Sequence, residues 1–288
     1  IGAYGIDSYF TFLNAYPDSP ETQWGDGEHM TIRWGFKTST MEKPSNPAYA
    51  EWVWDWNVLG FTYDSLLARE PYPPFDYMPW LCKDFEVFTW VDPEDGLTKT
   101  GVRFTLRDDV FWSDGTPFTA ADVEYSLVEL DDDLISLGFG PPWWYSNTAY
   151  IKSFYLIDPY NIEVLLDVKS YFAVGWIGGC IILPKHVWKA LVEQERASQE
   201  AGNPPGTAVD FWGPYVDPNV IGTGPFRFVE YVEESHTLLV ANLPGSTVQT
   251  AWEGSTPITS PGYFRLLPFD IQLEITDPPE LAYRHKIE

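Results

Sequence analysis

Apolar and polar residues alternate one for one along residues 102–107, which predicts a β-strand with one face in a core and the other in water. Residues 86–90 form a second strand-like run, and residues 92–96 between the runs have the Asp, Pro and Gly composition of a turn. The two runs therefore predict a β-hairpin. Residues 152–157 and 161–166 predict another hairpin, because Asp158 and Pro159 separate them.

The start of a helix is predicted after the first hairpin, at Thr119. This residue is a favourable N-cap, and Asp122, three residues later, completes a capping box. Asp114 and Gly115, which precede the cap, are interpreted as a turn rather than a binding site. The apolar residues around the cap and those that follow at helical spacing predict one buried helix face: Phe118, Val123, Leu127 and Leu130.

Four further segments complete the pattern. Residues 51–67 carry aromatic and apolar residues at spacings of three and four, which predicts a helix. A second helix is predicted from Pro184 towards Gly202. Short strands are predicted at residues 31–36 and 226–231, with one or two more in the tail, residues 263–275. Together these elements predict a mixed α/β fold class.

Length and composition exclude several classes of protein. The 288 residues suffice for one large domain or two lobes, of which we favour two lobes, and a hydrophobic share of 44% indicates a folded chain. The longest apolar run, residues 176–183, is far shorter than the roughly 20 residues of a membrane helix. The net charge of −25 excludes nucleic acid and anionic membrane surfaces as partners, because both are bound through Lys and Arg.

The residues that could carry metal or redox chemistry are sparse. Cys82 and Cys180 lie far apart in apolar surroundings, which favours buried free thiols and leaves a disulfide open. The three carboxylates at residues 131–133 are adjacent rather than alternating, which favours a solvated helix end over a calcium site. We therefore expect no metal and no cofactor. Because the chain begins at Ile1 without a signal peptide, we expect a processed or excised piece.

The sequence contains none of the common short catalytic motifs. Gly222, Thr223 and Gly224 are followed by neither a third glycine nor a helix pattern, so we interpret them as a tight crossing between lobes rather than a dinucleotide site. The acidic residues, 42 in all, leave a pair of catalytic carboxylates open. The aromatic share of 17%, with 14 Trp, is typical of a core or of a cleft for sugars or peptides. We favour capture of a small molecule over its chemical transformation.

Four blocks of sequence resemble a known family. In order they are Tyr-Asp-Ser-Leu-Leu at 63–67, Pro-Trp-Leu at 79–81, the hairpin strand and capped helix at 102–126, and Gly-Thr-Gly-Pro-Phe at 222–226. They resemble the family 5 extracytoplasmic solute-binding proteins of ABC importers, the oligopeptide, dipeptide and nickel-binding group. The resemblance extends from about Thr31 to Asn242.

The resemblance implies a periplasmic-binding-protein-like fold, a bilobal clamp that encloses its ligand. Residues 31–63 and 151–288 would form a discontinuous lobe I, residues 64–150 an inserted α+β subdomain, and residues 1–30 a lead-in. The usual large second lobe would be missing, because few residues follow the strand at 226–231. The implied role is extracytoplasmic capture, in the periplasm or at the cell surface, and delivery to ABC permease subunits; a membrane anchor in a longer parent protein is left open.

Two places are candidates for ligand binding. The resemblance puts the loop after the first strand at the cleft, here Thr38, Ser39 and Thr40. An aromatic run on a loop could stack on ligand or pack between lobes: Trp143, Trp144 and Tyr145. The favoured ligand is an oligopeptide. Open alternatives are an oligosaccharide, a carboxylate-dependent glycoside hydrolase, and a sensing or adaptor module that contacts a partner protein through a hydrophobic patch.

Overall fold

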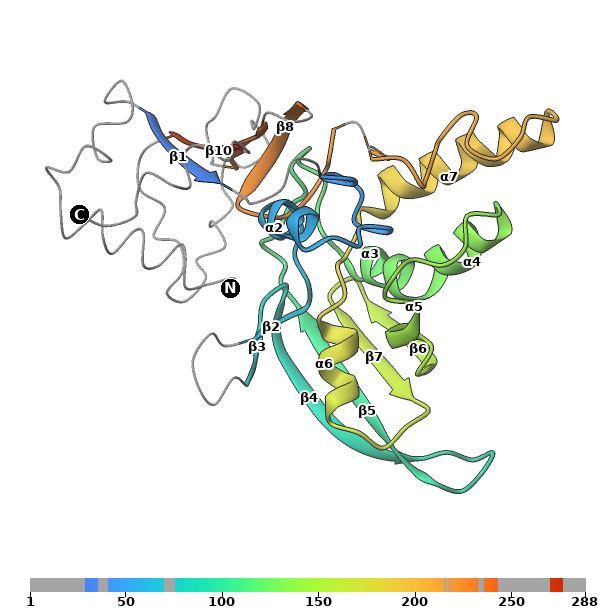
Figure 1. The fold of residues 1–288 in the computed structure, drawn as a ribbon. Coiled ribbons are helices and arrows are strands. Elements are labelled where there is room, and N and C mark those ends of the chain that lie inside the picture. The colour runs from blue at the N-terminus through green and yellow to red at the C-terminus, as the bar shows by residue number, and fades with distance from the viewer. Residues whose placement is uncertain are drawn as a thin grey trace, which may run out of the picture.

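The computed structural model describes residues 29–35, 41–69, 76–214, 216–217, 219–232, 236–242 and 270–276 (Figure 1). Its elements confirm the predicted mixed α/β fold class. The helical segments are α2 (Val53–Thr62), α3 (Ala120–Glu124), the π-helical turn η2 (Tyr125–Glu129), α4 (Leu130–Ser136), α5 (Tyr145–Thr148), α6 (Phe172–Gly178) and α7 (Lys185–Glu200). The strands are β1 (His29–Gly35), β2 (Leu67–Arg69), β3 (Tyr77–Pro79), β4 (Cys82–Val91), β5 (Thr98–Leu106), β6 (Ile151–Asp158), β7 (Asn161–Leu166), β8 (Phe226–Val232), β9 (His236–Ala241) and β10 (Asp270–Thr276). Among these described helices, none is long and apolar enough to cross a membrane.

The central sheet is antiparallel, with strands in the order β4-β5-β7-β6. Val102, Phe104 and Leu106 of β5 are buried, whereas Arg103 between them is half-exposed and pairs with Glu163 at 2.6 Å. This confirms the predicted alternation, and both predicted hairpins are present. In Figure 1, β4 and β5 extend as a long curved ribbon to a turn at the end of the sheet that lies away from α7.

The same sheet crosses the domain border predicted at residue 150. Strand β7 lies beyond that border, yet it pairs with β5 from Gly101 opposite Leu165 to Thr105 opposite Asn161. A subdomain that keeps its sheet intact therefore extends at least to the end of β7. The division into lobe I and an inserted subdomain stays a prediction, with this border displaced.

The predicted capped helix is present as the continuous run α3, η2 and α4. The Asp122 carboxylate accepts the backbone N–H of Thr119 at 2.9 Å, one half of the capping box, and the backbone N–H of Lys185 at 2.9 Å. Asp122 therefore also fixes the start of α7. Asp133 is nine-tenths buried and pairs with Lys189 at 2.7 Å and Arg196 at 3.1 Å, so the prediction of a solvated helix end is wrong for this residue.

Helix α2 is shorter than the predicted helix at 51–67. It ends at Thr62 because Tyr63 takes an extended conformation, with φ −123° and ψ 150°. The chain then forms an isolated bridge between Ser65 and Ile181 and continues into β2. Tertiary pairing thus overrides the helical spacing of the aromatic residues, and Trp52 at the predicted start remains 52% exposed.

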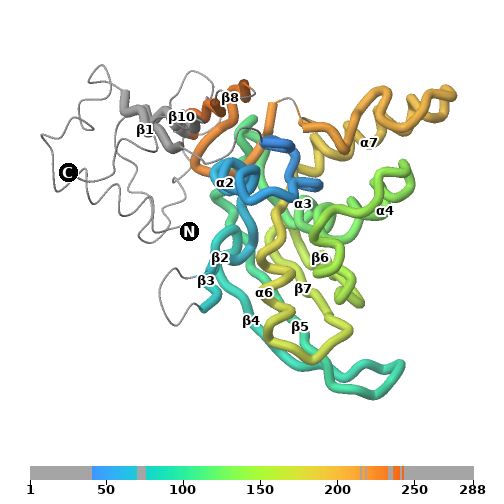
Figure 2. Tube along the Cα trace, in the orientation of Figure 1, coloured from blue at the N-terminus to red at the C-terminus, as the bar shows by residue number. Residues whose placement is uncertain are grey.

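A second sheet has the order β1-β10-β9-β8, with β1 parallel to β10 and the other pairs antiparallel. It contains the strands predicted at 31–36, at 226–231 and in the tail, with bounds that differ by a few residues. Figure 2 shows α2 beside the segment that leads into β8. The end of α2 packs against the start of β8, where the ring centroids of Phe61 and Phe226 are 5.4 Å apart.

The two cysteines are free and buried, as predicted. Burial raises the pKa of the Cys82 thiol to about 11 and that of the Cys180 thiol to about 12. The thiolate is the reactive form of cysteine, so burial and the raised pKa values disfavour nucleophilic reactivity of both residues at neutral pH.

Candidate ligand-binding site

A cavity of about 740 Å³ opens where α2, the chain after α2, and the residues before α5 meet. This volume lies within the usual range of small-molecule pockets, roughly 300–1,000 Å³. Its walls are largely apolar and aromatic, with two carboxylates. The residues that line it are Ala50, Glu51, Trp56, Gly60, Tyr63, Asp64, Ser65, Ala68, Trp80, Trp143, Gly179 and Ile181.

Trp143 and Trp56 form one aromatic wall of the cavity. Their ring centroids are 5.0 Å apart and their planes meet at 78°, the edge-to-face arrangement that aromatic pairs prefer. The indole N–H of Trp143 donates to the carbonyl oxygen of Pro47 at 3.0 Å, which fixes the orientation of the ring. With 41% of its surface exposed, Trp143 keeps a free area toward the cavity.

The two other predicted site residues that the structure describes lie elsewhere. Trp144 is buried in the core, where its indole N–H donates to the carbonyl oxygen of Ser126 at 3.1 Å. Tyr145 is exposed but does not belong to the cavity lining. The loop with Thr38, Ser39 and Thr40 lies outside the described residues. Of the three predicted residues that the structure describes, it therefore brings only Trp143 to this cavity.

Asp64 lies at the floor of the site, where three segments distant in sequence converge. Its carboxylate accepts the indole N–H of Trp80 at 2.7 Å and the hydroxyl of Thr223 at 2.9 Å. Its backbone carbonyl oxygen accepts the N–H of Ile182 at 3.0 Å. Burial raises the pKa of the Asp64 carboxyl, although both side-chain hydrogen bonds favour the charged form.

The glycines around Thr223 make this contact possible. The N–H of Gly224 donates to the carbonyl oxygen of Thr62 at 3.0 Å, so the two backbones run in close contact at the end of α2. A Cβ atom on Gly222 would lie 1.8 Å from that same carbonyl oxygen, and one on Gly224 would lie 2.4 Å from the carbonyl oxygen of Phe61. The predicted tight packing of the chain is present here and holds Thr223 against Asp64, and its place between two lobes stays a prediction.

Sequence reasoning missed Asp64, Trp80 and Trp56 as site residues. Asp64 and Trp80 both belong to the sequence blocks that carry the family resemblance, and Trp56 belongs to a helix face that we interpreted as core-facing. The available signal was the presence of polar and aromatic residues within the first two blocks. Only the fold shows that these blocks meet.

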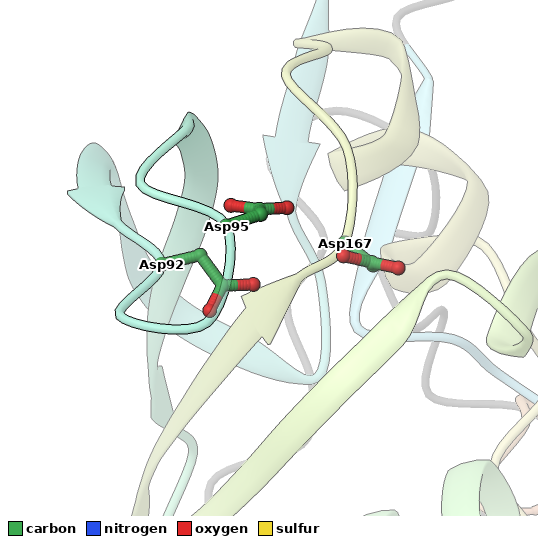
Figure 3. Close-up of side chains that lie close together, drawn as sticks. All are labelled: Asp92, Asp95 and Asp167. Atoms are coloured by element: carbon green, nitrogen blue, oxygen red, sulfur yellow. The ribbon is translucent and has the colours of Figure 1, made fainter.

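A second group of carboxylates surrounds a lysine at the end of the central sheet. Figure 3 shows Asp92 and Asp95 on the loop between β4 and β5, and Asp167 on the adjacent segment that follows β7. Their oxygens are close enough together to hold a metal ion. However, the ammonium of Lys99 lies 2.6 Å from the Asp92 carboxylate and 2.7 Å from that of Asp95, and it also pairs with Asp167. The position of a cation is therefore already taken by the protein itself.

Comparisons with known proteins agree on the fold. The structure of NikZ from Campylobacter jejuni in complex with Ni(L-His) is 21% identical, with a TM-score of 0.54 over 88% of this chain and 40% of that one. The DppA periplasmic binding protein from Helicobacter pylori, in complex with the peptide STSA, is 19% identical, with a TM-score of 0.53 over 87% and 43%. The oligopeptide-binding protein AppA from Bacillus subtilis, in complex with a nonapeptide, is 17% identical, with a TM-score of 0.56 over 88% and 42%.

The chain thus spans about two fifths of the length of these structures. No curated protein matches it in sequence. The model of one protein family, described as bacterial extracellular solute-binding proteins, family 5 Middle, matches residues 76–243, which is more than half of the chain. On this match, the chain belongs to the bacterial extracellular solute-binding proteins of family 5.

Proposed function

We propose that this chain is part of the substrate-binding component of an ABC importer, which captures an oligopeptide outside the cytoplasm and delivers it to permease subunits. The observation that carries the proposal is the aromatic-walled cavity in a chain of this family. Its volume of about 740 Å³ accommodates a few residues of a peptide. Family membership supports binding without chemical change, because the family is described as solute-binding proteins.

The lining of the cavity supports a peptide as the ligand. The rings of Trp56 and Trp143 offer apolar faces to side chains, while the carboxylates of Glu51 and Asp64 offer hydrogen-bond acceptors to N–H groups. Two of the similar structures were determined with bound peptides. A few placed polar groups in an apolar wall are the usual means of orienting a small ligand.

An oligosaccharide is the second candidate, and one observation favours it. Three tryptophans, Trp56, Trp80 and Trp143, line one cavity, and flat aromatic rings stack on the apolar faces of sugars. The indole N–H groups of Trp80 and Trp143 already donate to protein oxygens, so these rings would offer a sugar only their faces and edges.

Thermal unfolding of the full chain separates the two candidates. A ligand that binds only the folded state raises the Tm, by an amount that grows with its concentration over Kd. We expect peptides of two to five residues to raise the Tm and cello- and malto-oligosaccharides to leave it unchanged. A rise with the oligosaccharides alone would overturn the peptide assignment.

A matched pair of variants locates the binding. Trp143 and Trp176 have nearly equal exposed fractions, 41% and 42%, but only Trp143 lines the cavity. Trp143→Ala should therefore abolish the peptide-induced rise in Tm, whereas Trp176→Ala should retain it. Equal loss in both variants would place the peptide outside this cavity.

A further inference from the structure

The two outer strands of the central sheet, β4 and β6, differ in what they expose (Figure 1). The exposed residues of β4 include the charged Asp84 and Glu86. Charged side chains are one means by which proteins keep an edge strand from pairing with another chain. Strand β6 instead exposes three consecutive large hydrophobic residues, Tyr155, Leu156 and Ile157, with exposed fractions of 50%, 42% and 59%. The β6 edge therefore lacks the protection that β4 has.

The backbone of β6 is available on its outer side. Strand β7 pairs with the inner side, and within the described part of the chain the backbone groups of residues 153–157 make no hydrogen bond outside that ladder. Helix α3 packs near the end of β6, where the N–H of Ala120 donates to the carbonyl oxygen of Pro159 at 2.8 Å, but it leaves residues 155–157 exposed. A row of unpaired N–H and C=O groups is a template for one more strand.

The side chains of β6 indicate that the sheet stops before its core layer is closed. Phe154 and Leu156 lie on the core-facing side, because they pair with the buried Val164 and Ile162 of β7. Leu156 is nevertheless well exposed, since the core beneath the sheet does not extend past this strand. A further strand would cover Leu156, and removal of apolar surface from water is the main favourable term in association.

We propose that this edge pairs with β6 of a second copy of the chain, antiparallel and about a two-fold axis at Tyr155, so that the two central sheets become one. In this register Phe154 lies opposite Leu156 of the second copy. Lys152 and Asp158, the two charged residues of β6, lie opposite each other across the axis. The strand is thus complementary to itself, apolar against apolar and positive against negative, which is why the occupant is a second copy.

The two charges determine the register rather than the strength of the contact. Lys152 already lies 2.6 Å from the carboxylates of Asp92 and Glu94 in its own chain, so an opposing carboxylate adds little attraction. A shift by two residues in either direction would place Lys152 or Asp158 opposite an apolar residue of the second copy. A shift by one residue would exchange the two faces of the strand.

Sedimentation equilibrium of the full chain tests for the dimer. Because the contact is confined to one strand, we expect a weak, reversible dimer with a Kd of about 10–100 µM. Each copy carries a net charge of −25, so raising the salt concentration from about 20 mM to about 200 mM should tighten the dimer by screening this repulsion.

A matched pair of substitutions tests the edge itself. Tyr155→Lys would place two ammonium groups opposite each other on the axis and should weaken the dimer about tenfold or more. Tyr171→Lys adds the same charge at a residue outside the sheet with a similar exposed fraction, 53%, and should leave the Kd unchanged. Equal weakening by the two substitutions would overturn the placement at β6.

Introduced cysteines locate the axis. Directly opposite residues of antiparallel strands have Cα atoms about 4.5–5.5 Å apart, within the range that a disulfide spans. Diamide should therefore cross-link Tyr155→Cys into a covalent dimer about tenfold faster than Tyr171→Cys. Leu156→Cys should cross-link slowly as well, because this position faces Phe154 of the second copy rather than itself. The native Cys82 and Cys180 are buried, so they contribute little background.

The outcomes do not depend on the proposed capture of a peptide. No residue of β6 lines the cavity, so Tyr155→Lys should retain the peptide-induced rise in Tm. A chain that stays monomeric up to about 1 mM at both salt concentrations would overturn the dimer and leave the edge to an extended segment of a different protein. Equal cross-linking of Tyr155→Cys and Tyr171→Cys would overturn the two-fold register.

Discussion

Two groups of carboxylates in this chain have opposite surroundings. At the end of the central sheet, Asp92, Asp95 and Asp167 surround the ammonium of Lys99, and Lys152 pairs with Asp92 at 2.6 Å as well. In the cavity, the carboxylates of Asp64 and Glu51 face aromatic rings and have no cationic side chain among the described lining residues.

The difference separates a structural use of acidic residues from a binding one. The cluster around Lys99 connects the loop between β4 and β5 to the strands β6 and β7, and its charges are already compensated within the protein. The carboxylates in the cavity lack such compensation, so their charge remains available to a ligand. A cluster of acidic residues therefore indicates a binding site only where the protein supplies no cation of its own.

The largest effect is expected where the cavity floor depends on a close crossing of backbones. Gly222→Ala places a Cβ atom 1.8 Å from the carbonyl oxygen of Thr62, and relief requires a backbone shift that also draws Thr223 away from Asp64. We expect a loss of about 3 kcal/mol in the free energy of unfolding, measured by urea titration. The control is Gly60→Ala, because nothing lies within 4 Å of the Cβ it would add in helix α2. Equal stability of the two variants would contradict this account of the crossing.

A smaller loss of stability should follow from removing Lys99, the cation at the centre of the carboxylate cluster of Asp92, Asp95 and Asp167. Lys99→Met leaves Asp92, which is completely buried, with Lys152 as its remaining basic partner. We expect the Tm to fall by several degrees, because a buried charge loses a partner while its cost of burial remains. Lys83→Met is the control, since it breaks an ion pair with Asp108 in which both side chains are about half-exposed. Circular dichroism melts measure both, and an equal fall in Tm would show that burial does not distinguish the two pairs.

The two regions also differ in how far the sequence predicted them. The hairpin strands and the capped helix were predicted because their signals are local: alternation with period two, a turn composition, and a cap three residues before its partner. The contact between Asp64 and Thr223 spans 159 positions, and no local pattern contains it. The roles of Trp143 and Trp144 illustrate the same limit, because adjacent residues of one type differ only in whether they face the cavity or the core.

The dependence of stability on pH should have opposite signs in the two regions. Hydrogen bonds from Lys152 and Lys99 hold the pKa of Asp92 well below the ordinary value of about 3.9. The ionised Asp92 therefore stabilises the folded state fully above about pH 3.9. This stabilisation is lost as the pH falls through the lowered pKa. Burial raises the pKa of Asp64, so the folded state binds the proton of this carboxyl more tightly than the unfolded state does. The stabilisation that the bound proton gives is present at low pH and is lost as the pH rises through the raised pKa.

Melts between about pH 2 and pH 7 check this contrast, with the wild type as reference. The destabilisation by Lys99→Met should shrink toward the acidic end, because Asp92 of the variant has lost one of its two lysine partners and takes up a proton at a higher pH than Asp92 of the wild type. Asp64→Asn removes the titrating group, so its Tm should improve relative to the wild type as the pH rises. Differences that stay constant with pH in both variants would show that neither carboxyl titrates differently in the folded state.

The smallest effect on stability is expected at the aromatic wall of the cavity, because we expect this wall to bind ligand rather than to hold the fold together. Trp143 is partly exposed and makes edge-to-face contacts with Trp56 and Trp144, so Trp143→Ala should reduce the free energy of unfolding by about 1–2 kcal/mol. Trp144→Ala is the matched contrast, since its ring is almost completely buried and its loss should cost about 3–5 kcal/mol. Urea titration of the two variants measures these losses. Because a ligand-facing residue is retained for binding rather than for folding, an equal cost at both positions would mean that Trp143 belongs to the core and that the cavity wall is structural.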